Sequence, residues 1–217
     1  MDFHKDFQLN GISFSNSKEI IKFHNEISTE NHCFLEDWFS NTDFISVKTS
    51  GSTGKPKTIY LKKEHLQNSA FATANYFNLK AKTSALLCLS TNYIAGKMML
   101  VRALTLGWHL DVVAPNSNPL ENVNKTYNFS AMVPIQVENS LEKLNQIHKL
   151  IIGGGVVSNV LQNKLQTTKC NVFATYGMTE TITHIAVKKL NKLNSNNISS
   201  AVQKSIYQIL PNTNIFV

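Results

Sequence analysis

The chain has 217 residues, of which 42% are hydrophobic, 9% aromatic and 16% charged, and this composition predicts one soluble globular domain and excludes a disordered chain. The formal net charge is +7, but the lysines occur singly or in pairs, so we expect attraction of small anionic ligands and no nucleic-acid partner. No apolar run approaches the roughly 18 residues that a membrane span requires, and the N-terminus lacks a basic region followed by an apolar run. We therefore expect a cytoplasmic protein that does not bind a membrane.

The three cysteines, Cys33, Cys88 and Cys170, lie far apart and lack the spacing of metal ligands. The seven histidines are scattered in the same way, without HxxH or HExxH spacing. We expect buried thiols and no protein-ligated zinc.

Helical and apolar segments alternate along the chain. The predicted helices cover residues 17–27, 64–78, 95–107, 135–147 and 158–166, and the predicted strands cover residues 44–48, 58–61, 84–90, 109–115, 129–133, 149–155 and 171–177. Several strands are continuous apolar runs, which is typical of sheets covered by helices on both faces. The pattern predicts an α/β fold with mostly parallel sheets flanked by helices, followed by an exposed asparagine-rich loop at residues 191–200.

Residues 49–57, TSGSTGKPK, lie between two predicted strands. Two glycines let backbone N–H groups approach a ligand closely, four hydroxyls add donors, and two lysines add charge, so the set suits a polyphosphate. The common nucleoside-triphosphatase loop GxxxxGK[ST] is excluded, because Gly51 and Gly54 enclose two residues and Pro56 replaces the magnesium-binding hydroxyl. By composition alone, a flexible linker or hairpin loop is the alternative.

A second stretch, YGMTETITHIA at residues 176–186, follows a predicted strand. By itself it is better explained as a structural corner that carries a solvated carboxylate at Glu180. Together, the two stretches resemble the phosphate loop and the Tyr-Gly-x-Thr-Glu motif of the adenylate-forming superfamily, which includes acyl-CoA ligases, adenylation domains and luciferases. The resemblance implies the fold of the N-terminal core of these enzymes.

A third stretch, IIGGGVVS at residues 151–158, has some similarity to the dinucleotide motif GxGxxG. Ser158 replaces the last glycine, and no acidic partner stands near residue 175, which disfavours that interpretation. In adenylate-forming enzymes the equivalent loop forms one wall of the adenine pocket.

The superfamily resemblance implies ATP-dependent activation of a carboxylic acid as an acyl-adenylate, followed by thioester formation with coenzyme A. It implies that the loop holds the β- and γ-phosphates, that Thr179 contacts the α-phosphate, that Glu180 ligates Mg²⁺ and that Tyr176 lies against adenine. The residues implied to bind the nucleotide are Thr49, Ser50, Gly51, Ser52, Thr53, Gly54, Lys55, Gly153, Gly154, Gly155, Tyr176 and Gly177, and those implied to act in catalysis are Lys57, Thr179 and Glu180.

Residues 90–107 and 130–141 add a narrower similarity, to the o-succinylbenzoate–CoA ligases of menaquinone biosynthesis. Tyr93 is then expected to shape an aromatic acyl pocket, and Lys97 to pair with the second carboxylate of this dicarboxylic acid. An ordinary exposed helix residue is the alternative for Lys97. Arg102 lies about 140° further around the helix, so we do not expect it to join Lys97 at one carboxylate.

Full-length relatives continue into a ribose-binding aspartate and a mobile C-terminal domain with a catalytic lysine, neither of which has a counterpart before Val217. The resemblance therefore implies that residues 1–217 form an N-terminal AMP-binding domain that is nearly inactive by itself. Two alternatives stay open: activation of another acid, and a non-catalytic nucleotide-binding module.

Overall fold

The structure, a computed structural model of the chain, describes residues 2–27, 29–48, 57–191 and 206–211. Its strands are β1 (Gln8–Leu9), β2 (Ile12–Ser13), β3 (Phe44–Lys48), β4 (Thr58–Lys62), β5 (Ser84–Leu87), β6 (His109–Val112), β7 (Tyr127–Met132), β8 (Ile147–Ile152), β9 (Asn171–Gly177), β10 (His184–Lys189) and β11 (Gln208–Ile209). Its α-helices are α1 (Ser17–Ile27), α2 (Thr29–Phe39), α3 (Lys63–Phe77), α4 (Ile94–Leu106), α5 (Pro134–Asn139) and α6 (Asn159–Lys164). Short 3₁₀ helices follow as η1 (Leu141–Gln146), η2 (Leu165–Thr167) and η3 (Thr179–Thr181).

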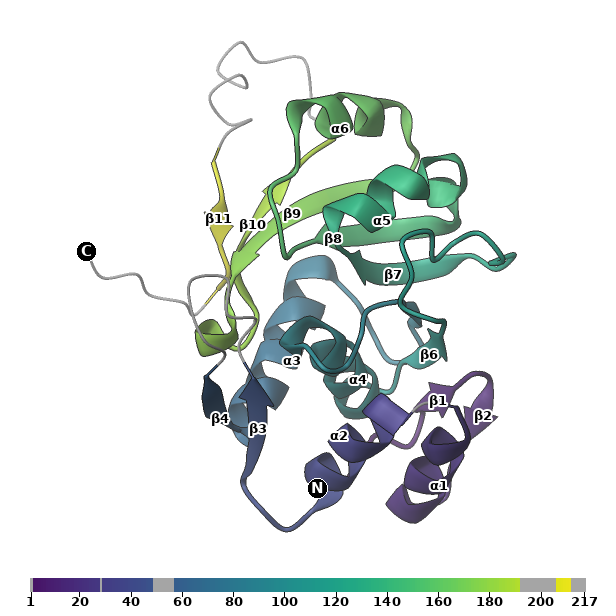
Figure 1. Cartoon of the computed structure of the whole chain (residues 1–217), viewed down its shortest axis with the longest axis vertical. Coiled ribbons are helices and arrows are strands. Elements are labelled where there is room, and N and C mark those ends of the chain that lie inside the picture. The colour runs from purple at the N-terminus through teal and green to yellow at the C-terminus, as the bar shows by residue number, and fades with distance from the viewer. Residues whose placement is uncertain (1, 28, 49–56, 192–205, 212–217) are drawn as a thin grey trace, which may run out of the picture.

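Within the described residues, nine strands form one sheet in the order β11-β10-β9-β8-β7-β5-β6-β1-β2 (Figure 1). The pairs from β1 to β9 along this order are parallel, whereas β2, β10 and β11 join the two edges in antiparallel fashion. The predicted α/β fold with a mostly parallel sheet is confirmed.

Helices cover both faces of this sheet, and successive side chains of the central strands supply both cores. On one face Leu87 and Phe129 pack with α1 to α4, and on the other Leu86 and Leu150 pack with α5 and α6. This explains why the central strands are continuous apolar runs, because a strand buried on both faces has no polar side. Cys88 and Cys170 are buried, as expected, and neither is paired in a disulfide within the described residues.

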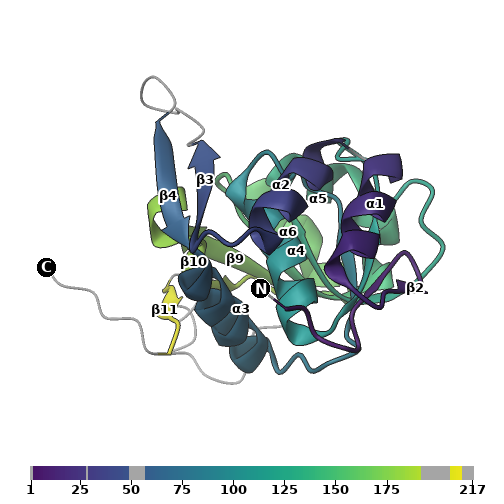
Figure 2. The same ribbon diagram turned by 90° about the horizontal axis from the view of Figure 1, so that it is seen from below.

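Strands β3 and β4 form a separate antiparallel ribbon beside α3 (Figure 2). Ile45, Val47 and Leu61 face the core, whereas Phe44 and Tyr60 are exposed on the other side. The ribbon is therefore anchored by one face only.

Several elements differ from those predicted. Helix α2, the β1–β2 pair, β10 and β11 were not expected, and the helix predicted over residues 135–147 is divided into α5 and η1. Asn191, the first residue of the predicted exposed loop, is buried, because its amide bonds with Val172 N–H and with the carbonyls of Leu165 and Cys170. The rest of that loop lies outside the described residues.

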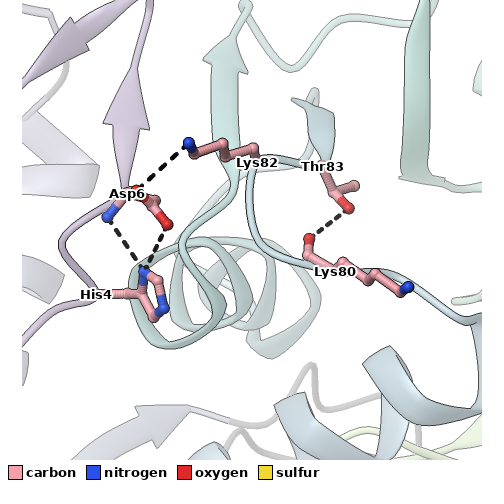
Figure 3. A network of polar contacts seen from close by, with 5 residues as sticks. All are labelled: His4, Asp6, Lys80, Lys82 and Thr83. Atoms are coloured by element: carbon pink, nitrogen blue, oxygen red, sulfur yellow. Dashed lines mark hydrogen bonds and ion pairs between the residues drawn. The ribbon is translucent and has the colours of Figure 1, made fainter.

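The N-terminal segment is tied to the end of α4 at the edge of the sheet (Figure 3). His4 Nδ1 accepts a hydrogen bond from the Asp6 backbone N–H at 3.1 Å, and the Asp6 carboxylate lies 3.9 Å from Lys82 Nζ. The His4 ring packs against Gly107, which ends α4 with φ of +70°. A Cβ atom on Gly107 would lie 2.3 Å from His4 Nδ1.

We predict that Gly107→Ala lowers the free energy of unfolding by more than Gly11→Ala does. Both glycines have positive φ, which costs an L-residue about 1 kcal/mol, but only the Gly107 substitution also meets a neighbouring ring, since the space around Gly11 is open. Urea denaturation of the two variants measures the difference. In the His4→Ala background, the further loss caused by Gly107→Ala should approach that of Gly11→Ala, and an equal loss in both single variants would contradict this packing.

Candidate functional site

The strands β5, β7, β8 and β9 run parallel, so their carboxyl ends lie at one edge of the sheet. Ligands of open α/β sheets bind outside this edge. Hydrogen bonds join the neighbouring ends: Gly153 N–H donates to the Met132 carbonyl at 3.1 Å, and Thr175 Oγ1 donates to the Ile152 carbonyl at 3.0 Å. The predicted segments after these strands are thereby brought together.

Gly153, Gly154 and Gly155 directly follow β8 at this edge. A Cβ atom on Gly153 would lie 3.0 Å from Thr175 Oγ1, and one on Gly155 would lie 3.4 Å from Pro134. Gly154 and Gly155 are exposed, so their backbone faces solvent without side chains in front of it. A flat ligand can lie directly against such a backbone.

Tyr176 and Gly177 end β9, next to the glycines in the sheet. The Tyr176 side chain is 55% exposed. Its ring packs edge-to-face with the Tyr207 ring, with 6.1 Å between the ring centroids. A Cβ atom on Gly177 would lie 2.2 Å from the Thr183 carbonyl oxygen, so the return of the chain into β10 requires glycine there. The glycine of the Tyr-Gly pair is therefore required by the turn into β10, and the tyrosine presents an exposed aromatic ring at the sheet edge.

The motif residues Thr179 and Glu180 lie in η3, and the Glu180 carboxylate is exposed. Within the part of the chain that the structure describes, no three His, Cys, Asp or Glu side chains are grouped to hold a metal ion. Magnesium in nucleotide sites is bound by one or two carboxylates together with phosphate oxygens, so a single exposed carboxylate fits such an ion.

Residues 49–56 of the predicted phosphate loop, Thr49 to Lys55 among them, lie outside the described residues. The strands on both sides of this segment are described: Lys48, at the end of β3, pairs with Thr58, at the start of β4, and Lys57 is exposed beside them. The yellow-green η3 lies beside this ribbon in both views (Figures 1 and 2). The strands that carry the loop are therefore neighbours of the Thr-Glu motif.

Tyr93 and Lys97 lie at the start of α4, after the carboxyl end of β5. Tyr93 is 56% exposed. Lys97 is half-buried, and its ammonium lies 5.0 Å from the centre of the Phe34 ring of α2, a cation–π contact. Their roles toward an acid stay predictions.

Arg102 is a residue of interest that the sequence interpretation set aside. It is 1% exposed, and its guanidinium donates to Thr73 Oγ1 at 3.3 Å, to Met99 Sδ at 3.8 Å and to Thr183 Oγ1 at 3.2 Å. Burial lowers its pKa to about 10, which leaves it charged at neutral pH. Among the described residues no carboxylate pairs with it, so a buried cation lies between α3, α4 and the start of β10.

His184 lies next to this cation at the start of β10. Its Nδ1 lies 3.2 Å from Thr183 Oγ1, and its buried Nε2 has no hydrogen-bond partner among the described groups. Burial and the charge of Arg102 lower the pKa of His184 to about 3, so the imidazole is neutral. The sequence did contain a signal for this cluster, the arginine in the apolar run MMLVRALTL. A charged residue on a buried helix face is rare unless it has a partner.

None of the helices in the described ranges is both long and apolar enough to cross a membrane.

In a comparison with known protein families, residues 45–217 match the model of a family described as AMP-binding enzyme. The 2-succinylbenzoate–CoA ligase of Listeria monocytogenes serotype 4b is 27% identical over 184 residues, which is 78% of this chain and 39% of the ligase. That of Bacillus mycoides is 25% identical over 162 residues, 70% of this chain and 34% of the ligase. The chain thus spans less than two fifths of the length of these curated relatives.

Solved structures give the same relationship. An acyl-CoA synthetase (AMP-forming)/AMP-acid ligase II-like protein from Dyadobacter fermentans has a TM-score of 0.76 and 34% identity, covering 90% of this chain and 57% of that protein. The O-succinylbenzoate coenzyme A synthetase of Bacillus subtilis, in complex with ATP and magnesium, has a TM-score of 0.61 and 25% identity. The match covers 67% of this chain and 32% of the synthetase.

We predict that Arg102→Met raises the free energy of unfolding by about 1–3 kcal/mol, because it replaces an unpaired buried charge with an apolar side chain of similar length. Lys97→Met on the same helix is the control and should change stability by less, roughly 0.5 kcal/mol, because that ammonium is only half-buried. Urea denaturation measures both. A clear loss of stability in Arg102→Met would show that the native fold pairs this charge.

Proposed function

Because residues 45–217 match its family model, the chain belongs to the AMP-binding enzyme family, and we propose that it serves in ATP-dependent ligation of a carboxylic acid to coenzyme A. The observation that supports this most is structural. The glycine run after β8, Tyr176 after β9 and the Thr-Glu motif of η3 share one sheet edge, beside the ribbon that carries the predicted phosphate loop.

In this proposal the nucleotide lies along that edge. The backbone of Gly153, Gly154 and Gly155 and the ring of Tyr176 enclose the adenine. The loop at residues 49–57, including Lys57, holds the β- and γ-phosphates. Thr179 contacts the α-phosphate, and Glu180 would hold Mg²⁺, which would neutralise charge on the phosphates.

The proposed reaction has two steps. A carboxylate oxygen of the acid attacks the α-phosphorus, the bond to the β-phosphate oxygen breaks, and pyrophosphate leaves. The thiol of coenzyme A then loses its proton and attacks the acyl carbon, and AMP leaves. Donors aimed at the phosphates stabilise charge in line with the attack, which is where the lysine and threonine side chains of the two motifs would act.

For the acid we propose o-succinylbenzoate, because several curated relatives are 2-succinylbenzoate–CoA ligases. This acid carries two carboxylates, of which one reacts and the other needs a cationic partner. Arg102 is the stronger candidate, because its buried charge lacks a carboxylate among the described residues, whereas Lys97 already lies over Phe34. Tyr93, exposed before α4, would line the aromatic part of the pocket.

The second candidate is a nucleotide-binding module without ligase activity, because the glycine run and Tyr176 at the sheet edge suit a nucleotide whether or not an acid reacts there. Acid-dependent pyrophosphate release separates the two functions. Release that depends on o-succinylbenzoate supports the ligase, and nucleotide binding with no release in the presence of any acid supports the module.

We predict that Glu180→Gln weakens Mg-ATP binding about tenfold, because it removes the charge of a metal ligand, equivalent to roughly 1.4 kcal/mol. Titration calorimetry with Mg-ATP measures the change. Binding of AMP without metal should stay the same in this variant.

The matched control is Glu142→Gln, at an exposed carboxylate of η1 before the amino end of β8. It should bind Mg-ATP as the unchanged protein does. Equal effects of both substitutions, or no Mg-ATP binding by the unchanged protein, would contradict the proposed site.

A further inference from the structure

The Thr-Glu motif is joined to β10 by a strained turn. Ile182 has φ of +69° and ψ of −51°, and Thr183 N–H donates to the Thr181 carbonyl at 2.8 Å, which together make a γ-turn of the rare positive-φ kind. A β-branched residue in this conformation is an outlier that persists only where its surroundings enforce it. The Thr181 hydroxyl helps to enforce it by donating to the Thr183 carbonyl at 2.8 Å.

The turn places the Thr183 hydroxyl between Arg102 and His184. Arginine can only donate, so Arg102 Nη2 donates to Thr183 Oγ1. The hydroxyl proton of Thr183 then has one acceptor among the described groups, the Nδ1 atom of His184. A neutral imidazole that accepts at Nδ1 carries its proton on Nε2.

Thr73 repeats this pattern on the other side of the guanidinium. Arg102 Nε donates to Thr73 Oγ1 at 3.3 Å, and the Thr73 hydroxyl donates onward to the Ser69 carbonyl at 2.9 Å. Each threonine thus turns its lone pairs toward the arginine because its own proton has an acceptor elsewhere. For Thr183 that acceptor is a side chain, His184, and not a backbone carbonyl.

Donors outnumber acceptors in this cluster. Each terminal nitrogen of Arg102 carries two hydrogens but makes one hydrogen bond to a described group, and one of these is to the weak acceptor Met99 Sδ. The Nε2–H group of His184 is buried without any partner in the described structure. Buried donors without partners are costly in native structures, so a cluster with more donors than acceptors suits an anionic group.

We infer that Thr183 and His184 are positioning residues for the acid, which hold the Arg102 guanidinium in the orientation that binds the second carboxylate. The inference rests on the proposed function, because it takes the ligand to be the acid. The imidazole acts as a fixed acceptor: it turns the Thr183 hydroxyl so that a lone pair, and not the proton, faces Arg102. The γ-turn at Ile182 places this pair next to the nucleotide motif in the chain.

The test is the affinity of the unchanged full chain and its variants for o-succinylbenzoate by titration calorimetry, with Mg-ATP binding measured in parallel. Thr183→Val keeps the side-chain shape and removes the hydroxyl, and it should weaken acid binding at least tenfold while Mg-ATP binding changes less than twofold. Thr183→Ser restores the hydroxyl and should bind the acid within about threefold of the unchanged protein.

Thr105→Val is the matched control, because it removes a buried hydroxyl of α4 that has no partner among the described groups. It should bind the acid normally. If Thr183→Val and Thr105→Val both bind like the unchanged protein, the positioning role is overturned while the proposed function stands. If the unchanged protein binds Mg-ATP but neither o-succinylbenzoate nor benzoate, the assignment of an acid site fails, and the inference falls with it.

A second measurement does not depend on the acid and serves if Thr183→Val fails to fold. The ¹⁵N chemical shifts of the His184 ring should show a neutral imidazole with its proton on Nε2 between pH 6 and pH 8. Adding o-succinylbenzoate should shift these resonances, and benzoate, which lacks the second carboxylate, should shift them less. A ring protonated at Nδ1, or one that responds equally to both acids, would overturn the inference.

Discussion

Parallel pairing of β5, β7, β8 and β9 is the constraint on which the proposed site depends. Each strand ends at the same sheet edge, so three stretches that are far apart in the chain lie near one another. These are the start of α4, the glycines after β8 and the Tyr-Gly pair at the end of β9. Burial on both faces keeps these strands in register, because a slip would move apolar side chains out of both cores. The fold therefore sets the positions of the site backbone, while loops supply its chemistry.

The second determinant is a buried charge. Arg102 would stabilise the native protein little or not at all, since its cation has lost its hydration and finds two hydroxyls and a sulfur atom as partners among the described residues. A cluster of this composition is poorly suited to a core and well suited to an anion. Stability and ligand binding then make opposite demands on one residue, as is common at functional sites.

Much of the architecture could be predicted from the sequence because the central strands are continuous apolar runs. Leu86 and Leu87 belong to an apolar run that only burial on two faces explains, and the alternation with helices then implies parallel pairing. The two motifs likewise predicted one shared nucleotide site, which stays a prediction. Helix α2 also had a signal, since Phe34, Leu35 and Trp38 show helical spacing and are all buried.

Other features depend on contacts that no local pattern contains. Strand β10 pairs with β9 through a register that shifts between His184 and Ala186, and its residues were interpreted only as the end of a motif. Lys97 and Arg102 lie on one helix, α4, as the sequence interpretation assumed. What the sequence did not reveal was which neighbours each cation meets, Phe34 for the first and Thr183 for the second.

The central claim is that one nucleotide lies across the ends of β8 and β9. Photolabelling with 8-azido-ATP, followed by tryptic peptide mapping, tests it most directly, because the azide reacts with whatever surrounds the adenine. The account predicts label on peptides 150–164 and 170–188, which contain the glycine run and Tyr176, and predicts that excess ATP prevents it. Label confined to other peptides, or label on these two that ATP does not prevent, would contradict it.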